Sequence, residues 1–592
     1  MLDFIKNIFK YTEQKQTEGG WELLEDENEN IDKKGLQVDL SEKDFDKIKK
    51  KSQKSTEKNN QNNSKKPLNV KEWNQAKKSE KASALLAESQ IKNDIVSSNL
   101  EVNMEYLNQK FHIYESEQVI IRELNVAKKI NSFVIFISGM IDNTTLNQFV
   151  IPQLMNENNF SHFSEGCPLD YISKNVISIN EITKTNNFKD IISGILSGLT
   201  AFFIEECDSC LLIESRGYEK RSVESPVTES SIKGSHEGFT ENLGTNLTLL
   251  RRIIKNENLT VKNIQLGTTN KSSCSLVYIK GITNTKLIKE VEKRINSVSA
   301  DLALGNGFLE QYIEDRPYSI FPQILSTERP ERTASFLMEG RVVVLTEGTP
   351  FSIAMPATFV DLIHTSEDFF LRWPYASFLR ILRILALFIS FILPGLYVAL
   401  TLFHHEMIPT SLLMTIINTR EEVPFPVVIE ILVMEVAFEL IREGGVRMPG
   451  VIGQTLGIVG ALILGQAAVA AGLVSPILII VVAMTGLSNF SIPNYLLAWA
   501  LRVLRFAFIL FGAVLGFYGI SLGLAFVLAG LCNVKSFGVP ILSPIAPKTK
   551  SSQDIFLRYP LWLKKSRPDY LNTNDKNRMS DNPRKWEGKK GD

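Results

Sequence analysis

The 592-residue sequence has little cysteine and no excess of charge of either sign. Its five cysteines are too few for a disulfide framework. Lys plus Arg and Asp plus Glu both number 65, so the formal net charge is zero. This balance excludes a globally basic nucleic-acid-binding protein, and we expect no nucleic-acid partner. The first residues also lack a cleavable export signal, which predicts that the N-terminal part stays in the cytoplasm.

Charge is absent from two long stretches of the second half, residues 448–501 and 506–534. A soluble core needs no such runs, whereas a helix that crosses a bilayer needs about 20 mostly apolar residues. We therefore expect an α-helical transmembrane domain over residues 381–545, with four to six spans. The candidate spans are residues 384–403, which Pro394-Gly395 would break, 424–441, 451–471, 473–487 and 506–534, with 407–418 as a weak sixth.

The charge of the C-terminal tail sets the expected topology. After Pro547 the sequence has twelve Lys and Arg against six Asp and Glu, which predicts a basic cytoplasmic tail over residues 546–592. With both ends in the cytoplasm, the number of crossings must be even. Five apolar segments do not fit that rule unless one of them is re-entrant or interfacial.

The first half divides by composition. Residues 1–100 form a polar head rich in Lys, Asn, Gln and Ser, which buries too little apolar area to fold. Residues 101–330 predict a cytoplasmic α/β domain of two subdomains, 101–205 and 206–330, so that the whole chain is α+β. Residues 117–130 and 241–255 predict helices, and residues 132–146 and 274–287 repeat one pattern of apolar strand, glycine turn, Asn/Thr cap and helix.

A connector is expected between this domain and the membrane. Residues 331–380 contain a strand pair around Glu347-Gly348 and a segment in which aromatic residues alternate with arginines. Aromatic rings and wet basic ends are typical of a membrane interface.

Carboxylates inside one candidate span are the best functional signal. At about 100° per residue, Glu435, Glu439, Arg442 and Glu443 share one face, and Glu430 lies nearly opposite Glu439. A charge at the bilayer centre costs about 3 kcal/mol, so these side chains should face a bundle interior, a water path or one another. One hypothesis is a cation pathway. The other is an ion-pair network in which Arg442 pairs with Glu435 and Glu439, or an interfacial position of these charges near the cytoplasm.

Small residues spaced four apart, such as Gly512 and Gly516, predict close helix packing in lipid. Catalytic motifs are missing, including the P-loop, the H-E-x-x-H zinc motif and the G-x-S-x-G nucleophile motif. Cys207 and Cys210 have C-x-x-C spacing without a second pair, and His404-His405-Glu406 is more typical of a wet loop than of a cation site. We therefore expect no enzyme, no cofactor and no metal site.

Several motifs occur in order along the chain. They include Gly234-Ser-His-Glu-Gly-Phe-Thr-Glu-Asn242 with Leu249-Leu-Arg-Arg252, and later runs at 314–323, 327–330, 339–350, 367–370, 420–426, 487–493 and 538–547. Together they resemble the A subunits of the GerA-type spore germinant receptors, over about residues 110–570. Ser235-His236 departs from the family pattern of Pro followed by a basic residue. The matching residues are Glu237, Gly238, Phe239, Glu241, Asn242, Arg251, Arg252, Glu314, Arg316, Pro317, Gly340, Gly348 and Pro350.

The resemblance implies a multi-pass protein of the spore inner membrane that acts in germination. It implies a B-type transporter-like subunit and a C-type lipoprotein subunit as partners, with A subunits forming a homo-oligomer in membrane lipid. A subunits of this family are thought to form a nutrient-gated cation channel. The alternatives are a non-conducting signalling scaffold, or the paralogous A-like protein of the dipicolinic-acid channel operon. A secondary transporter is a further alternative, but no inverted repeat is visible in the sequence.

Overall fold

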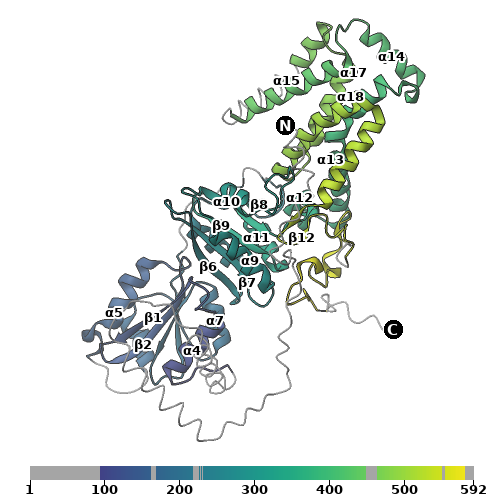
Figure 1. Cartoon of the computed structure of the whole chain (residues 1–592). Helices are drawn as coiled ribbons and strands as arrows, with labels where there is room; N and C mark the ends of the chain where they lie inside the picture. Colours follow the sequence, from purple (N-terminus) through teal and green to yellow (C-terminus); the bar gives the residue numbers. More distant parts are fainter. Residues whose placement is uncertain are drawn as a thin grey trace. The chain divides into compact units, whose positions relative to one another are not determined.

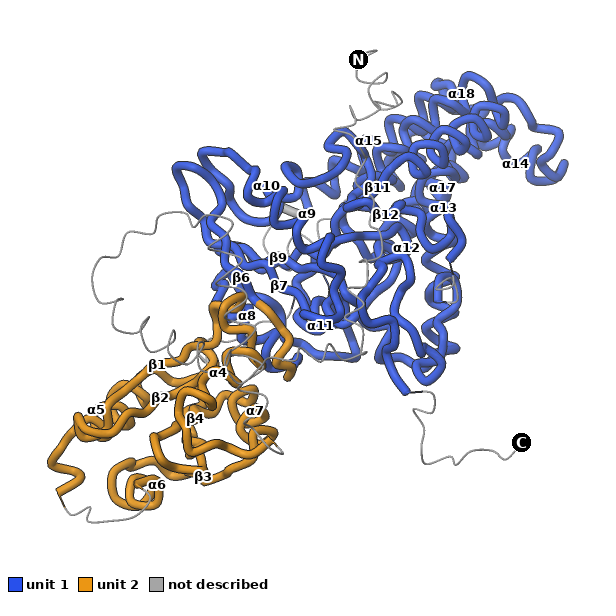
Figure 2. The backbone as a smooth tube through the Cα atoms, turned by 60° about the horizontal axis from the view of Figure 1, so that its bottom comes forward, with its two compact units in different colours: residues 1–24, 219–254, 261–592 blue, residues 25–218, 255–260 orange. Residues whose placement is uncertain are grey.

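The computed structural model describes residues 94–161, 168–217, 226, 229, 231–447, 463–549 and 554–580. The predicted polar head lies almost wholly outside these residues, as does most of the candidate span 451–471. The chain divides into two compact units, one of residues 25–218 and 255–260 and the other of residues 1–24, 219–254 and 261–592 (Figure 2).

The first unit contains a five-stranded antiparallel sheet in the order β1-β2-β4-β5-β3. The strands are β1 (Val119–Val126), β2 (Ile130–Ile137), β3 (Ile182–Thr185), β4 (Thr200–Ile204) and β5 (Cys210–Ile213). Each face of the sheet has its own apolar core. The helical elements of this unit are α4 (Leu100–Lys110), η1 (Thr145–Val150), α5 (Ile151–Met155), η2 (Glu157–Phe160), α6 (Pro168–Tyr171), η3 (Ile172–Val176) and α7 (Phe188–Leu196) (Figure 1).

The helix expected at residues 117–130 is wrong, because this segment is β1 and the turn into β2. Leu124 and Val126 are buried while the residue between them is exposed, which is the period of two that a strand requires. Ala127 and Lys128 then adopt positive φ and turn the chain directly into β2. In so short a segment, the alternation of a strand is difficult to distinguish in the sequence from the periodicity of a helix.

The second unit contains another five-stranded sheet, in the order β6-β7-β9-β10-β8. Its strand order repeats that of the first sheet, and β2 and β7 bury the same positions along the strand. Gly139 and Gly281, which follow these strands, share a φ of 84°. The repeat expected at residues 132–146 and 274–287 is therefore present. The strands are β6 (Leu259–Leu266), β7 (Ser272–Ile279), β8 (Leu325–Thr327), β9 (Val342–Thr346) and β10 (Ser352–Met355).

The structure moves two of the expected domain boundaries. β9 and β10 belong to the second sheet, since β9 pairs with β7 through Leu276 and Val344, so residues 331–380 are not a separate connector. A pair of strands on its own would be only marginally stable, whereas in this sheet β9 also pairs with β7, and β10 also pairs with β8. The boundary at residue 205 likewise falls between β4 and β5 of one sheet.

Helices and the chain end complete the second sheet. The helical elements are α8 (Leu243–Ile253), which confirms the expected helix, α9 (Thr285–Asn296), α10 (Gly305–Ile313), α11 (Pro330–Glu339), α12 (Phe359–Ile363) and η4 (Ser366–Phe369). Phe537 and Val539, which follow the last long helix, are part of the apolar core of this sheet, and Tyr570 packs against it. Further elements after that helix are β11 (Lys535–Ser536), β12 (Val539–Pro540), η7 (Leu561–Leu563) and η8 (Asp569–Leu571).

The remaining helices of this unit form an apolar bundle (Figure 1). Its described elements are α13 (Trp373–Leu402), η5 (His405–Met407), α14 (Thr410–Arg420), α15 (Val427–Arg447), α17 (Pro476–Phe490) and α18 (Tyr495–Cys532). By length and composition, two helices of the described part, α13 and α18, could cross a membrane. Pro394 lies inside α13, which continues through it rather than breaking.

Glycines fix how α13 and α18 pack. A Cβ atom on Gly395 would overlap the carbonyl oxygen of Phe508, and one on Gly512 would overlap that of Gly395. The two backbones therefore touch at this crossing, as the small-residue spacing predicts. At Gly516 the backbone leaves helical geometry, with φ 59° and ψ −138°, so α18 is two helices. Gly519 lies against the Phe511 carbonyl, so the second helix folds back along the first.

Candidate functional site

Residues of the first family motif anchor α8 to the second sheet. Asn242 caps α8 by accepting a hydrogen bond from the Thr245 amide, and the Gly348 amide donates to the Glu241 carbonyl at 2.8 Å. The Arg252 guanidinium lies 2.9 Å from the Glu237 carboxylate. Phe239 is buried, as are Gly238 and Arg251. These residues hold an α/β corner together and gather no reactive group.

The later motif residues have equally local roles. Gly340 ends α11 in the left-handed region, where a Cβ atom would overlap the Thr573 side chain. Gly348 has positive φ in the turn between β9 and β10, and Pro350 follows it. The Arg316 amide donates to the Gln323 side chain at 2.9 Å, with Pro317 next in sequence.

Two carboxylates on or beside α10 have unusual environments. Burial, with repulsion from Glu314, raises the pKa of Glu310 to about 8. Burial, with a smaller contribution from Asp315, raises the pKa of Glu314 to about 7. Both values exceed the ordinary 4.5, so the folded state holds more protons than the unfolded state between pH 4.5 and 8, and stability falls as pH rises through this window.

We expect Glu310→Gln to flatten this pH dependence. In the wild-type protein, amide hydrogen exchange in α10, corrected for the intrinsic rate, should speed up from pH 5 to pH 8. The variant should show a smaller change, because one of the two titrating groups is gone. Glu123→Gln, at an exposed position of β1, is the control and should behave as wild type. Equal pH profiles for the Glu310 variant and the wild type would contradict the assignment.

Glu435 forms a fully buried ion pair at the centre of the bundle. Its carboxylate lies 2.6 Å from Arg505 Nη1 of α18, and neither side chain is exposed to solvent. Arg505 Nε also donates to the Ser390 carbonyl of α13 at 2.8 Å. One arginine therefore joins α13, α15 and α18.

The other carboxylates of α15 have arginines nearby. Glu439 lies 3.2 Å from Arg502, 3.4 Å from Arg442 and 3.8 Å from Arg505. Glu430 accepts a hydrogen bond from the Ser475 amide at the start of α17 at 2.5 Å, and lies 3.7 Å from Arg420. Glu443 is exposed.

Sequence reasoning therefore found the acids and missed three of the four bases. It paired Arg442 with both Glu435 and Glu439, but the structure places Arg442 with Glu439 and gives Glu435 to Arg505. Arg502 and Arg505 lie between the two uncharged stretches, and this position is the feature of the sequence that could have indicated them as partners of the acids. The cluster holds three carboxylates and four guanidinium groups: Glu430, Glu435, Glu439, Arg420, Arg442, Arg502 and Arg505.

Several polar atoms of this cluster are buried without a hydrogen-bond partner in the structure. Within the described residues they include Glu435 Oε1 and Arg505 Nη2, whereas Glu430 Oε2 faces Arg420 Nε at 3.7 Å. Buried polar groups in proteins are nearly always satisfied, by protein or by ordered water. A buried carboxylate oxygen without a hydrogen-bond partner is a group to which water or a cation can bind.

A second charged cluster joins the base of α13 to the C-terminal tail. The buried Asp368 carboxylate lies 3.1 Å from Arg380 and 2.9 Å from Arg383, and Arg380 lies 2.9 Å from Asp554. Arg558 donates to the Leu371 and Phe369 carbonyls. Burial opposes ionisation of Asp368, but the two arginines still lower its pKa. Arg380 is thus buried, which corrects the expectation that these arginines stay wet.

A cavity of about 160 Å³ adjoins this cluster, between α11, α12 and the tail. Its charged lining groups already pair with protein groups. Arg332 lies 2.7 Å from Glu229, Asp361 lies 2.7 Å from Arg341, and Lys564 pairs with Asp554. These three groups therefore offer no unpaired charge to a ligand in the cavity.

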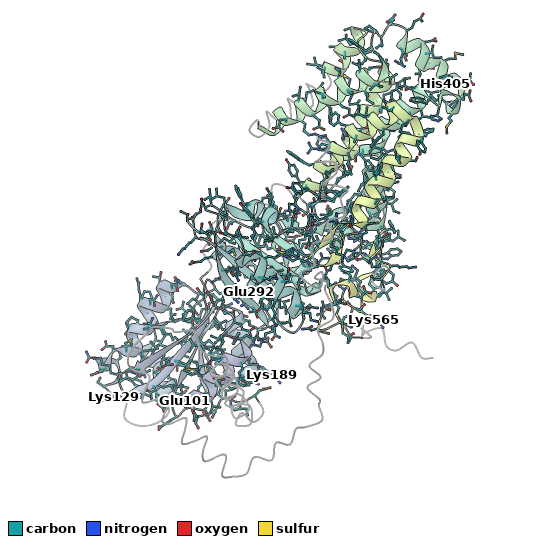
Figure 3. The ribbon with its side chains drawn as sticks, in the orientation of Figure 1. Glu101, Lys129, Lys189, Glu292, His405 and Lys565 are labelled. Atoms are coloured by element: carbon teal, nitrogen blue, oxygen red, sulfur yellow. The ribbon has the colours of Figure 1, made fainter. Side chains whose placement is uncertain are left out.

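The remaining sequence candidates do not form a site. Cys207 and Cys210 are buried in the cores on opposite faces of the first sheet. His404 stacks on Phe517 with ring centroids 4.4 Å apart, and His405 is exposed at the tip of the helical bundle (Figure 3). Within the described residues, no group of three His, Cys, Asp or Glu side chains is placed to hold a metal ion.

The architecture combines an α/β part of two repeated sheets with an apolar helical part that contains paired charges and two helices long and apolar enough to cross a membrane. Residues 105–570 match the Bacillus/Clostridium GerA spore germination protein family, and the chain belongs to that family. The family inferred from the sequence motifs is thereby confirmed.

Relatives match along most of their length. Spore germination protein KA of Bacillus subtilis (strain 168) is 39% identical over 493 residues, covering 83% of this chain and 90% of the relative. Uncharacterized membrane protein YfkQ of the same organism is 36% identical, covering 83% and 95%. The solved N-terminal domain of the A subunit of the Bacillus megaterium spore germinant receptor GerK3 is 28% identical. It covers 45% of this chain and 99% of that one, with a TM-score of 0.37.

Proposed function

We propose that this protein is the A subunit of a nutrient germinant receptor in the spore inner membrane, and that it acts as the cation-conducting core of an oligomer. Its partners would be a B-type transporter-like subunit and a C-type lipoprotein subunit. Its role would be electrostatic rather than enzymatic. Membership of a spore germination family supports the biological setting.

The observation that carries the conducting role is the set of buried polar atoms without partners along α15. Glu435 keeps one carboxylate oxygen without a hydrogen-bond partner inside an apolar bundle, and Glu430 Oε2 has only the Arg420 guanidinium, at 3.7 Å. Carboxylate oxygens attract monovalent cations, and water can form hydrogen bonds with the neighbouring buried polar atoms. The pathway would therefore pass Glu435 and Glu439, with Glu430 at one end.

A non-conducting scaffold is the second candidate, because arginines surround the same acids. Four guanidinium groups against three carboxylates leave this cluster with a formal excess of one positive charge, which disfavours cations. In that function the ion pairs hold the bundle in one arrangement.

We further propose an even number of membrane crossings, with both chain ends in the cytoplasm. One contact supports this topology, since the Phe359 amide, which precedes α13 in the chain, donates to the carbonyl of Ile541, which follows α18, at 2.7 Å. The reversal at Gly516 gives residues 506–534 a place in two helices rather than one. Under this proposal, the reversal would supply the additional crossing that five apolar segments lack.

Ion conduction by the assembled receptor in planar bilayers tests the proposal. Single replacement of Glu435 would leave Arg505 buried alone, so the informative variants are Glu439→Gln and the charge-neutral double variant Glu435→Gln, Arg505→Gln. Each should lower cation selectivity, and the unitary conductance by about twofold or more, because carboxylates near a pore set cation preference.

Glu406→Gln provides the matched control, since Glu406 is an exposed carboxylate of η5 outside the cluster. It should conduct as the wild type does. Unchanged selectivity and conductance in both cluster variants, with assembly intact, would refute a pathway past these acids. Absence of current from assembled wild-type receptor would favour the scaffold.

A further inference from the structure

An apolar patch covers the outer side of α10 and its flanking loops. We call Leu302, Leu304, Phe308, Tyr312, Tyr318 and Ile320 the α10 patch. Leu304, Phe308 and Tyr312 recur four residues apart and are 54%, 46% and 56% exposed, and Tyr318 is 65% exposed. The opposite side of α10 packs Leu309 and Ile313 into the sheet core. A surface helix normally carries polar residues on its outer side, so the patch requires a partner.

The patch adjoins the point where α18 leaves the bundle. Arg316 donates to the Asn533 side chain at 3.0 Å, and the Phe537 amide donates to Asp315 at 2.6 Å. Asn533 directly follows α18, and the first charged residue after the uncharged stretch is Lys535. If α18 spans a bilayer, the segment after α10 lies at the surface of that bilayer.

The sheet order gives the side of the subdomain on which α10 lies. α10 packs on β9 and β10, towards the β8 edge, whereas α9 packs on β9. The segment before β8 joins the region after α18, because Ser536 donates to the Gln323 carbonyl at 2.6 Å. Both helices reach the segment after α18, since Asp315 follows α10 and accepts from the Phe537 amide, and Arg294 of α9 lies over the Phe537 ring at 4.3 Å from its centroid.

The charges of α10 are arranged as an interfacial helix requires. At 100° per residue, Glu310 and Glu314 fall on the flank opposite Phe308 and Tyr312. These two carboxylates thus do not stand between the aromatic rings and a lipid surface. Tyrosine and other amphipathic rings are favoured at headgroup depth.

We propose that the α10 patch inserts into the lipid headgroup region of the membrane that the helical bundle occupies. The inserted patch fixes the orientation of the second sheet relative to the bilayer. This inference depends on the membrane insertion of the bundle under the proposed function.

Quenching by spin-labelled lipid tests the contact. The full chain is reconstituted in nanodiscs of phosphatidylcholine and phosphatidylglycerol, with Cys167 and Cys532 replaced by Ser. An environment-sensitive fluorophore is attached at Phe308→Cys or Tyr312→Cys. Headgroup-depth nitroxide lipids should quench either position about twofold more than the control Lys289→Cys, an exposed position of α9.

A probe at Phe388→Cys, exposed near the middle of α13, distinguishes membrane insertion of the bundle from lipid contact of the α10 patch. Quenching there by deep nitroxide lipids establishes insertion of the bundle. Quenching at Phe388 without quenching at positions 308 and 312 overturns the α10 contact alone. Failure at Phe388 overturns the membrane insertion itself.

A second copy of the chain is the competing occupant. Shielding of positions 308 and 312 that appears in discs with several copies, but not in discs with one copy, would overturn the lipid assignment. The double variant Phe308→Ser, Tyr312→Ser gives an independent readout in the unlabelled protein. Hydrogen exchange in residues 305–320 should then become the same in nanodiscs as in detergent, while the wild type should be slower in nanodiscs.

Discussion

Arg505→Met is expected to destabilise the folded bundle by about 3–5 kcal/mol, since it leaves the fully buried Glu435 carboxylate without its cation. The same change removes the hydrogen bond from α18 to the Ser390 carbonyl of α13. The measurement is the thermal and denaturant stability of the reconstituted protein, together with the yield of monodisperse material.

The double variant Glu435→Leu, Arg505→Met shows whether the lost stability is that of an uncompensated charge. Removing both partners of a buried pair is often neutral, so the double variant should regain most of the loss. Arg372→Met, at an exposed position before α13, should have no measurable effect. If Arg505→Met were as stable as the wild type, the buried pair would not be part of the native bundle.

Gly512→Ala should also disrupt the bundle, with a loss of about 3 kcal/mol, near the upper end for an added methyl group in a packed core. The added Cβ atom would overlap the Gly395 carbonyl oxygen, and neither backbone can rotate out of the way as a side chain could. Gly395→Ala meets the Phe508 carbonyl at the same crossing and should have a similar effect. Disulfide trapping between α13 and α18 near this crossing would report their separation.

Gly530→Ala is the control within α18. A Cβ atom there has no neighbour within 4 Å, and alanine favours the helix over glycine by about 1 kcal/mol. The control should therefore be as stable as the wild type or slightly more so. The two disruptive changes combined should cost less than their sum, because they act at one crossing. Full stability of Gly512→Ala would mean that the helices do not meet there.

The sequence predicted those features that depend on local patterns. The strands at β9 and β10, the helix α8, the repeat of β2 and β7, and the family followed from apolar runs and motifs. β1 was taken for a helix because its alternation covers only eight residues. The placement of β9 between β7 and β10 was out of reach, since strand order depends on contacts far apart in sequence.

The difference between local patterns and contacts far apart in sequence also explains which residues of the candidate site were predicted. The acids of α15 stand out because charge is rare in an apolar helix, and they were found. Arg505 is 70 residues from Glu435 in sequence, so nothing local indicates that the two meet. The fold-back at Gly516 was equally invisible, because glycine is common in packed membrane helices and only the backbone angles separate a turn from a contact.

The core of the second sheet has a consequence for biosynthesis. Phe537, Val539 and Tyr570 complete that core, yet they are translated after every helix of the bundle. A ribosome that has finished β6 to β10 has therefore produced an unfinished hydrophobic interior, which closes when the last helix has emerged and the tail has docked. If the helices enter a membrane, as proposed above, maturation of the second sheet thus waits for their integration, and a chain that stalls during integration keeps an open core that quality-control proteases can detect.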